Sequence, residues 1–495
     1  MRAASNVAII GGGISGAVCA SILAGKGVSV TVFESGRGPG GRMSQRREAT
    51  GDGSELRFDH GAPYFTADHG EVAGIVRSWE ARGLVAEWKA KFGCFDRNTG
   101  EFSDFEKEGT AKKYVGVPGM NSICKALCSE AGVEAKFGVT VGKVDWLHER
   151  SLWSLASLDG QDLGHFDAVV ASDKNISSRR FTGLTEKPPP LDITLFPALS
   201  VMSQDIPVHS CFALMLAFAE PLTSIPVKGF SFKNSELLSW AFCDSSKPGR
   251  TCMPPVRETW VLHSTAEYAS KVIAQNGLRK PSNDALARVA EELFQEFKTA
   301  GLNIPRPVFM KAHRWGSAFP GAVIGGEDKC LWDKNSKLAI CGDFCASPNV
   351  EGAVLSGTRA ASKLLGSLSL LSAAILTISS AEDEDEEEEE EKEGAGGSPQ
   401  PMETTRRSST VAARGNSCLL LRTWVMAAAV GLPMASPAPT ATSLLRPSTE
   451  LISTAPPPSA PAHVAAHTSR RRKLKPSDST ASARENRNGA PVAMS

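Results

Sequence analysis

The sequence predicts an α/β fold whose first element is a Rossmann-type nucleotide-binding unit. Residues 7–10 (VAII) form an apolar run of strand type, and the loop 11–16 (GGGISG) that follows fits the pattern G-x-G-x-x-G. This loop opens onto a helix-compatible stretch that ends near residue 25, and a second β-branched strand covers residues 28–33. Strand, glycine loop, helix and strand in this order are typical of the βαβ unit that binds a dinucleotide.

The glycines and one acid explain how such a unit holds a dinucleotide. Gly11 permits the tight turn, Gly13 lets the backbone approach a pyrophosphate, and Gly16 allows helix and strand to pack closely. The start of the helix offers unpaired N–H groups and a partial positive charge to the phosphates. Glu34, 18 residues after Gly16, stands where a carboxylate can accept hydrogen bonds from the hydroxyls of an adenosine ribose.

Length and charge exclude some classes of partner. The chain has 495 residues, enough for more than one folding unit, and its 54 Lys and Arg balance its 54 Asp and Glu. We therefore expect a small-molecule substrate and neither a nucleic acid nor a membrane as partner. The charges are segregated in the last part of the chain, where residues 382–393 are acidic except for Lys392 and residues 470–475 are basic except for Leu474.

Composition also predicts a tail and a compartment. Residues 380–495 are rich in Ala, Pro, Ser, Thr and Arg, and we expect them to form a disordered low-complexity tail. The 11 cysteines follow no disulfide-framework spacing, which favours a reducing compartment. The first strand begins at residue 7, which leaves no room for a leader, and the apolar stretches 364–378 and 418–435 fall short of the ~20 residues of a spanning helix. A cytoplasmic protein is expected.

The pattern up to about residue 375 indicates two domains. Residues 138–144 and 166–172 look like returns to the nucleotide-binding sheet, since both are β-rich. Residues 191–265 contain several strand-like runs, and residues 284–300 form an amphipathic helix whose apolar stripe predicts core packing. The expected division is a discontinuous cofactor domain of residues 1–70, 115–185 and 330–375, and a mixed α+β substrate domain of residues 71–114 and 186–329.

Two further segments favour FAD over NAD. Residues 37–44 (RGPGGRMS) supply a second glycine turn, with Gly41 and Arg42, close to the ribose carboxylate. Such a turn suits a cofactor whose pyrophosphate and ribityl chain pass two loops. Near the end of the folded part an apolar strand leads into Asp343, which can hydrogen-bond a ribityl hydroxyl. A helix start expected at residues 352–356 would direct its positive end towards the flavin, where it stabilises the negative charge of the reduced ring.

Together these motifs resemble the FAD-dependent amine-oxidase superfamily, and more closely its renalase-like branch. Residues 59–66 (DHGAPYFT), which include Gly61, look like that branch's Asp-x-Gly-Ala loop beside the flavin. Residues 117–123 (VPGMNSI) are similar to its glycine-containing segment before a helix, and residues 313–315 (HRW) to its Trp-containing strand. The resemblance covers residues 5–370 and omits the tail.

This resemblance implies a glutathione-reductase-like FAD-binding domain with an inserted mixed α+β substrate domain, and non-covalent FAD. It also implies that the backbone of Val141 contacts the adenine. The cofactor residues expected from the motifs and the resemblance are Gly11, Gly13, Gly16, Glu34, Gly41, Arg42, Gly61, Val141, Asp343 and Val350.

By the same resemblance the protein is an FAD-dependent oxidase. It would take a hydride from a small organic donor of the dihydronicotinamide type onto flavin N5, with reoxidation by O₂ or another acceptor. An amine or polyamine oxidase, or a desaturase of the same superfamily, is the alternative. Only three tyrosines are present, none after Tyr268, so the paired aromatic rings common in amine oxidases are not evident. A non-enzymatic alternative is a flavin-binding module whose tail mediates interactions.

The sequence does not identify the catalytic residues, and the candidates are His60, Trp315 and His263, with His313 beside them. His60 lies in the loop expected at the flavin and would act as a general base or only through its backbone. His263 closes an apolar strand and is interpreted as a core or rim histidine. Trp315 either walls the substrate pocket or fills the core.

No cluster of residues has the spacing of metal ligands, so no metal is expected. Cys341 and Cys345 bracket the Gly-Asp turn. We interpret them as buried, inert thiols rather than as a redox pair or a point of covalent flavin attachment.

Overall fold

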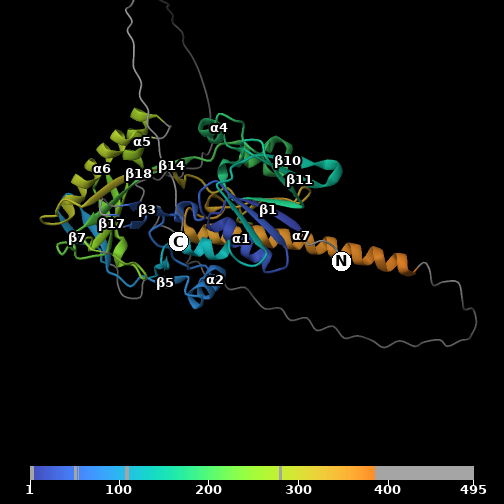
Figure 1. Ribbon diagram of the computed structural model, residues 1–495, viewed down its shortest axis with the longest axis horizontal. Helices are drawn as coiled ribbons and strands as arrows, with labels where there is room; N and C mark the ends of the chain where they lie inside the picture. The colour runs from blue at the N-terminus through green and yellow to red at the C-terminus, as the bar shows by residue number, and fades with distance from the viewer. Residues whose placement is uncertain are drawn as a thin grey trace, which may run out of the picture. The chain divides into compact units, whose positions relative to one another are not determined.

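The computed structural model describes residues 5–49, 53, 55–105, 111–252, 254–277 and 281–384, and of residues 369–384 only the backbone (Figure 1). All of these residues belong to the first of the two compact units into which the chain divides, Met1–Pro433. The predicted tail lies outside the described residues except at its start, because a long last helix continues to Glu384.

A six-stranded sheet forms the nucleotide-binding part, in the order β19-β20-β13-β1-β2-β9. Its strands pair in parallel except for β19, which is antiparallel to β20. The sheet is buried on both faces, since alternate residues of β1 belong to different apolar clusters. The strands are β1 Asn6–Ile10, β2 Ser29–Glu34, β9 Val133–Phe137, β13 Ala168–Ala171, β19 Leu331–Asp333 and β20 Leu338–Ile340.

One predicted return to this sheet is confirmed and the other is wrong. The run at 166–172 contains β13, which pairs with β1. The run at 138–144 instead begins β10 in a separate three-stranded sheet, and the return to the nucleotide-binding sheet is β9. Strand β9 (VEAKF) is an edge strand whose charged residues point to solvent, so it lacks the continuous apolar run by which a buried parallel strand is found.

Two helices lie side by side on one face of this sheet. Helix α1, Ile14–Ala24, follows the glycine loop, and α7, Val350–Glu384, follows the Gly-Asp turn (Figure 1). Their axes approach closely because Gly357 of α7 has no side chain: a Cβ there would lie 2.2 Å from the carbonyl oxygen of Ser15. The last helix is thereby held against the helix that starts at the dinucleotide loop.

A seven-stranded sheet forms the second part, in the order β18-β14-β17-β16-β15-β6-β7. Neighbouring strands are antiparallel, except that β15 and β6 run parallel. The strands are β6 Phe92–Asp96, β7 Glu101–Ser103, β14 Val208–Phe218, β15 Gly229–Lys233, β16 Leu238–Cys243, β17 Glu258–Ser264 and β18 Phe309–Pro320.

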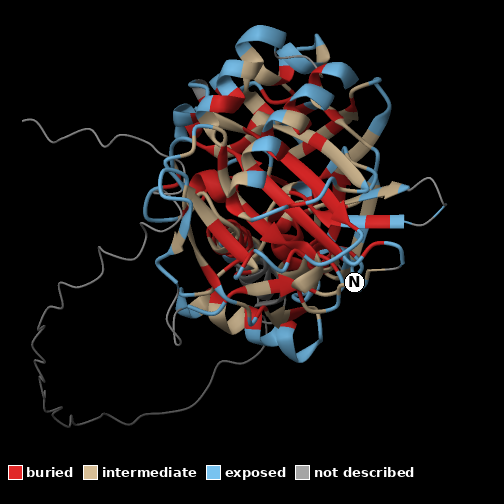
Figure 2. Ribbon diagram, turned by 90° about the vertical axis from the view of Figure 1, so that its left-hand side faces the viewer, coloured by how far each residue is buried: buried red, intermediate tan, exposed pale blue. Residues whose placement is uncertain are grey.

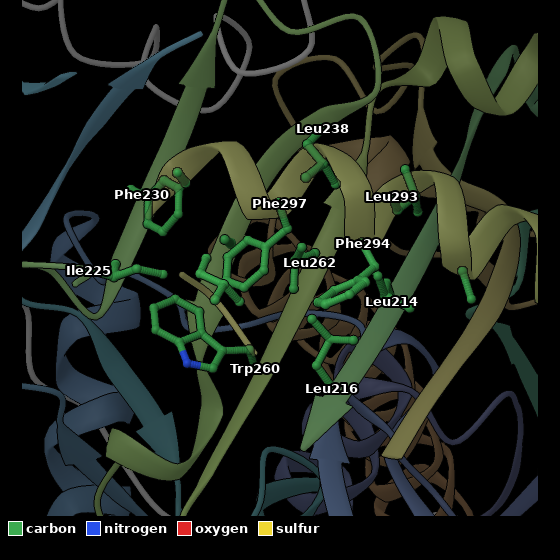
Figure 3. Close-up of a cluster of buried hydrophobic side chains, with 14 of the residues drawn as sticks. Leu214, Leu216, Ile225, Phe230, Leu238, Trp260, Leu262, Leu293, Phe294 and Phe297 are labelled. Atoms are coloured by element: carbon green, nitrogen blue, oxygen red, sulfur yellow. The ribbon is translucent and has the colours of Figure 1, made fainter. Parts of the chain in front are cut away.

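One face of this second sheet is covered by α5, Ala266–Asn276, and α6, Asn283–Phe297 (Figure 1). The helix expected at 284–300 is thus present, and its apolar stripe packs into the core as predicted. Figure 3 shows this cluster between α6 and the sheet, with the labelled side chains Leu214, Leu216, Ile225, Phe230, Leu238, Trp260, Leu262, Leu293, Phe294 and Phe297. Each such side chain contributes about 1.5–3 kcal/mol on burial, so this face is structural. Part of the opposite face is covered as well, since Met215 and Val261 pack there against Phe58.

The remaining elements connect these two sheets. Residues 152–166 contain strands β11 and β12, which pair in an antiparallel manner. The other elements are β3 Gln45–Ala49, β4 Glu55–Asp59, α2 Gly70–Ala81, β5 Val85–Glu87, β8 Tyr114–Gly116, α3 Asn121–Leu127, β10 Val141–Leu147, β11 Leu152–Ser157, β12 Asp162–Phe166 and α4 Arg179–Thr185. Figure 2 shows the inner strands largely buried and the outer helices exposed on one side. Every helix among the described residues is too short or too polar to cross a bilayer.

Candidate active site

The glycine loop has the geometry that the motif predicts. Gly11 has φ +105°, a conformation that favours glycine, and its N–H donates to the carbonyl of Phe33 at 2.8 Å. Gly16 lies so close to the loop that a Cβ would come within 2.1 Å of the Gly11 carbonyl oxygen. Strand β1, the loop and helix α1 can therefore pack in this way only with glycine at both positions.

Gly13 provides the test of whether a dinucleotide fits. A Cβ at Gly13 would meet no atom within 4 Å, although the residue is in an ordinary extended conformation with φ −69°. Gly13 is also the N-cap of α1, and no side chain caps that end of the helix. The backbone is therefore open on this side and points the free N–H groups of a helix start into the space, which is what a phosphate group requires.

Glu34 closes the loop from the second strand. Its Oε2 accepts the N–H of Gly12 at 2.7 Å, and its Oε1 accepts the N–H of Gly36 at 2.6 Å. These two bonds fix the carboxylate at the end of β2, next to the loop. A carboxylate oxygen can accept more than one hydrogen bond, so Glu34 can still accept from ribose hydroxyls.

The second glycine turn lies directly on the first. The N–H of Gly40 donates to the carbonyl of Gly12 at 2.9 Å, and a Cβ at Gly41 would lie 3.5 Å from the Cα of Gly13. Gly40 and Gly41 have φ +132° and +51°, so both use conformations that other residues rarely adopt. The predicted pairing of the two turns at one site is therefore seen in the backbone.

Arg42 and Asp343 meet across this turn. The guanidinium donates through Nη1 to Oδ2 at 2.6 Å and through Nη2 to Oδ1 at 2.7 Å, and Nη1 also donates to the carbonyl of Ala318 at 3.0 Å. Burial lowers the pKa of Arg42, but its contacts with Asp343 outweigh that effect and leave the pKa raised. Two residues expected to hold the cofactor separately thus hold each other, and Ala318 joins them to β18 of the second sheet.

Helix α7 starts two residues earlier than the predicted 352–356 segment. It begins at Val350, and the side chain of Asn349 accepts the N–H of Gly352 at 2.7 Å. The predicted start is two residues late because Asn349, a favoured N-cap residue, sets the beginning of the helix. Gly342 is also tied to this helix, since its N–H donates to the hydroxyl of Ser356 at 2.9 Å.

Val141 lies close to the Glu34 end of the sheet. The N–H of Val139 donates to the carbonyl of Glu34 at 3.0 Å, and that of Gly138 to the carbonyl of Gly36 at 2.8 Å. Val141, two residues further on, is buried at the start of β10. Its contact with an adenine stays a prediction.

The loop after β4 brings Gly61 against the second turn. A Cβ at Gly61 would lie 1.9 Å from the carbonyl oxygen of Arg42, and the N–H of Ala62 donates to the same oxygen at 2.9 Å. His60 precedes this contact and is 3% exposed, and its Nδ1 has no hydrogen-bond partner among the described residues. Gly61 therefore packs against the second glycine turn, and His60 precedes it there. The contact of Gly61 with a cofactor stays a prediction.

Three histidines and a tryptophan gather on the face of the seven-stranded sheet that lies opposite α5 and α6. His263 of β17 and His313 of β18 both pair with Ala213 of β14, so they flank it in one row on one face. The His60 ring lies 4.8 Å from His313 and 4.8 Å from Trp315, measured between centroids. All four candidates named from the sequence, in three separate segments, thus form one group.

The main-chain carbonyl of His60 ties this group together. The indole Nε1–H of Trp315 donates to it at 2.9 Å, and Nε2 of His263 lies 3.2 Å away and hydrogen-bonds to it. His263 is therefore a satisfied, buried histidine that supports the His60 loop. Trp315 also supports this loop through its indole N–H, and its ring lies beside the rings of His60 and His313.

The surroundings hold all three histidines neutral at physiological pH. Burial, followed by the charge of His313, lowers the pKa of His60 to about 3. Burial also lowers the pKa of His263 to about 4, and burial with the charges of Arg46 and Lys311 lowers that of His313 to about 4. The group is therefore electrically neutral and lies among cations.

A buried charge cluster that the sequence did not reveal holds the start of the His60 loop. Asp59 accepts the N–H of Met120 at 3.1 Å and pairs with Arg250, and Lys247 bonds Asp244 at 2.6 Å and Asp59 at 3.4 Å. The side chains of Lys247 and Asp59 are both 0% exposed. Charged residues in turns are ordinarily solvated, so only their meeting in space, nearly two hundred residues apart, could have identified them.

Metal and redox chemistry of the side chains finds no support in the described part of the chain. No group of three or more His, Cys, Asp or Glu there can hold a metal ion. Cys341 and Cys345 are buried, and burial raises the pKa of the Cys341 thiol to about 12 and that of Cys345 well above its usual value. Such thiols are poor nucleophiles, as interpreted from the sequence.

Comparison with known proteins finds two family models along this chain. Residues 9–79 match the NAD(P)-binding Rossmann-like domain. Residues 76–365, more than half of the chain, match the flavin containing amine oxidoreductase model. A carotenoid phi-ring synthase from Streptomyces griseus is 37% identical over 71 residues, 14% of this chain and 14% of its own length. The chain thus spans about a seventh of that curated relative.

Solved structures with the same fold include two oxidases. A proposed protoporphyrinogen oxidase from Exiguobacterium sp. 255-15 superposes with a TM-score of 0.53 at 12% identity, over 74% of this chain and 100% of its own. Putrescine oxidase bound to putrescine superposes with a TM-score of 0.51 at 14% identity, over 73% of this chain and 99% of its own. At such identities the similarity establishes the fold alone.

Proposed function

Since the chain belongs to the flavin-containing amine oxidoreductase family, and is thus an FAD-dependent oxidoreductase, we propose that it oxidises a small, uncharged ring donor of the dihydronicotinamide type. FAD, when bound, supplies the two-electron acceptor at flavin N5, and O₂ or another acceptor takes the electrons on. The cofactor would lie on the two stacked glycine turns, with Glu34 at the ribose and the Arg42–Asp343 pair further along. The donor would lie between the flavin and the His313 and Trp315 end of the seven-stranded sheet.

The neutral histidine group among cations carries this proposal. An amine substrate is an ammonium ion at neutral pH and needs a carboxylate or a cage of aromatic faces. Three cations, Arg46, Lys311 and Arg314, and one anion, Glu48, act on the pKa values of the rings at this end of the group. Glu48 is already engaged, since it bonds Arg46 at 2.6 Å and Lys311 at 2.8 Å. An uncharged donor meets no electrostatic penalty there, whereas an ammonium ion does.

The aromatic residues of the group have the shape for a planar donor. Trp315 offers an indole face beside His60 and His313, and its N–H is held by the carbonyl of His60, so the ring is fixed in place. Fixing a donor near ~3–3.5 Å from its acceptor supplies much of the rate of a transfer.

An aromatic cage for an amine is present elsewhere but is filled. Tyr64 lies with Phe92 and Phe242 at centroid distances of 5.8 Å each. The ammonium of Lys113 sits 4.4 Å from the Phe92 ring and 5.5 Å from that of Tyr64. The protein's own lysine thus occupies the position that a substrate amine would take.

Anaerobic flavin reduction tests this function. The purified protein should show the flavin absorbance near ~450 nm, a property of the cofactor, and this should bleach with dihydronicotinamide isomers but not with polyamines or aryl amines. Trp315→Leu should slow bleaching at least tenfold because the donor loses its wall, an effect worth about 1.4 kcal/mol. Trp146→Leu, in β10 away from the group, is the matched control. Reduction by amines alone would overturn the proposal, and a colourless protein would contradict the cofactor.

A further inference from the structure

Trp240 is a half-buried tryptophan that the candidates from the sequence do not include. It belongs to β16, and its partner in register is His263 on β17. The side chains of partners in register are neighbours on one face of a sheet, so Trp240 lies beside His263. The next residue, Ala241, points to the opposite face and packs into the cluster beneath α6.

A β-bulge turns Trp240 towards this face. Leu238 pairs with Ser264 and Trp240 pairs with His263, so β16 has one residue more than β17 at this point. In a regular strand, residues two apart point to the same face. Leu238 packs in the cluster beneath α6, and the extra residue, Ser239, therefore places Trp240 on the other face. Bulges re-aim side chains in this way next to active sites.

Trp315 lies beside a second irregularity of the same sheet. The register of β14 against β18 shifts between His209 and Cys211, and Cys211 is the partner of Trp315. Among the described strand pairs of the seven-stranded sheet, the register shifts at these two places. Each shift has a tryptophan of the same face directly beside it, as expected where a sheet is shaped for a ligand.

The loop from His60 to Tyr64 connects the surroundings of the two tryptophans. At its start, the indole N–H of Trp315 donates to the carbonyl of His60 at 2.9 Å. At its end, the ring of Tyr64 lies 5.8 Å from that of Phe242, and Trp240 stacks on Phe242 at 5.7 Å with an interplanar angle of 8°. The loop that resembles the flavin loop of the family thus has a tryptophan near each end.

The ring of Trp240 is fixed by Phe242 and has only small neighbours on the outer strands. Its partner on β15 is Ser231, and the partner of Ser231 on β6 is Cys94. Both are half-buried and too small to cover an indole ring. Val350, which is expected at the flavin, packs at the edge of the same apolar cluster as Trp240. A rigid and partly accessible aromatic surface of this kind suits a planar ligand group.

The two tryptophans are too far apart to hold a single ring. Trp315 lies on β18 and Trp240 on β16, with β14 and β17 between them. Three strand spacings amount to about 14 Å, which exceeds the width of one six-membered ring. A donor ring at Trp315 therefore leaves Trp240 for a second group.

The charges near Trp240 indicate an uncharged second group. The ammonium of Lys113 lies 5.5 Å from the Tyr64 ring, so a second cation is repelled at this end of the loop. The negative face of an indole ring disfavours an anion. The side chains of Ser231 and Cys94 carry no charge that would compensate either.

We propose that Trp240 forms a second subsite, which binds an uncharged planar group attached to the ring of the hydride donor. This inference rests on the proposed function, because it assigns the group to the same donor whose ring lies at Trp315. It makes Trp240 a residue that determines specificity for the length and the aromatic character of the donor.

A matched pair of donors tests the inference. Anaerobic stopped-flow reduction of the FAD-loaded protein is measured with dihydronicotinamides that carry a methyl or a benzyl group on N1, each used as the isomer that reduces the flavin. The native protein should reach half-saturation at a concentration at least tenfold lower with the benzyl donor, since its ring gains apolar burial and an aromatic contact.

Substitutions at the subsite should change this ratio of half-saturation concentrations. Trp240→Leu should remove most of it, whereas Trp240→Phe, which keeps an aromatic ring, should retain most of it. Ser231→Leu fills the space beside Trp240 and should also reduce the ratio, so the test does not depend on one variant that folds. Trp146→Leu, at a half-buried tryptophan of β10, is the matched control and should leave the ratio intact.

The outcomes separate this inference from the proposed function. Reduction by both donors at equal half-saturation, or an unchanged ratio in Trp240→Leu, would overturn the subsite and leave the proposed function standing. If neither donor reduces the flavin, the proposed function fails, and equilibrium dialysis of the benzyl donor against native protein and Trp240→Leu then decides the subsite. Loss of FAD from Trp240→Leu would assign the ring to the cofactor and overturn the inference.

Discussion

Arg42 and Asp343 lie 301 residues apart in the chain and face each other through two parallel hydrogen bonds of 2.6 and 2.7 Å. The pair links the second glycine turn to the end of β20. The carboxylate is buried, with 3% of its side chain exposed, whereas the guanidinium is 36% exposed. The arginine can therefore reach a ligand from one side while the aspartate holds it from the other.

Replacing Asp343 tests this pair. Asp343→Asn leaves a neutral amide that accepts only one of the two bonds, so a partly buried guanidinium loses its counter-charge. We expect the cofactor-free protein to lose about 2 kcal/mol of unfolding free energy, and FAD content to fall. Urea denaturation and the flavin absorbance measure the two effects.

An exposed pair serves as the control for that variant. Glu291 accepts two bonds from Arg306 at 2.9 and 2.7 Å, but both side chains are largely solvent-exposed. Glu291→Gln should change stability by less than about 1 kcal/mol, because such pairs are screened by water. Equal losses in the two variants would mean that the Arg42–Asp343 pair has no special part in the site.

Two neighbouring glycines should respond oppositely to the same substitution. Gly13→Val adds a side chain where no atom lies within 4 Å, so the cofactor-free protein should keep its stability to within about 0.5 kcal/mol while FAD affinity falls at least tenfold. Gly16→Val overlaps the Gly11 carbonyl and should cost about 3 kcal/mol or more of stability. Thermal unfolding and FAD titration of both variants compare these effects. Normal FAD binding by Gly13→Val would contradict the prediction that the FAD phosphates approach the backbone at Gly13.

The histidine group predicts a loss of stability in acid. The pKa of His60 is lowered to about 3 and those of His263 and His313 to about 4, whereas the unfolded chain takes up these protons near pH 6.5. Between these values the unfolded state binds more protons, so stability is full above pH 6.5 and falls as the pH drops towards 4. Three such groups give a slope of up to about 4 kcal/mol per pH unit.

A single substitution isolates the contribution of one histidine to this pH dependence of stability. His263→Asn should lower the slope of unfolding free energy between pH 4 and 6 by up to about 1.4 kcal/mol per pH unit, as expected for one proton. The exposed His165→Asn should leave it unchanged. Urea midpoints at a series of pH values give the slopes, and identical slopes in all three proteins would contradict the assignment of the shift.

The buried cluster at Asp59 should be among the most sensitive places in the chain. Lys247→Met removes a fully buried ammonium and leaves Asp244 without its 2.6 Å partner, which should cost about 3–5 kcal/mol. Lys143→Met breaks a comparably short but exposed pair with Asp145 and should change stability by less than about 1 kcal/mol. Chemical denaturation of the two variants makes the comparison, and a near-neutral Lys247→Met would show that the cluster does not hold the His60 loop.

Local signals were enough to predict the nucleotide-binding end of the site. Gly11, Gly16 and Glu34 lie within one βαβ unit, where each residue's task follows from turn geometry and strand ends over a short stretch of chain. The second turn with Gly41 could be read in the same way. The sequence does not predict strand β9 because an edge strand carries a weak apolar pattern, and it predicts the start of α7 two residues late because that start depends on a single capping asparagine.

The amino-acid sequence alone therefore determined the fold class, the family and the dinucleotide loop, because these depend on residues close together in the chain. Only the tertiary structure decided which of the candidate site residues meet in space. His60, His263 and His313 come together because strand pairing places the last two on either side of Ala213 and the Arg42 turn supports the loop of the first. Neighbours in space are set by packing rather than by spacing along the chain.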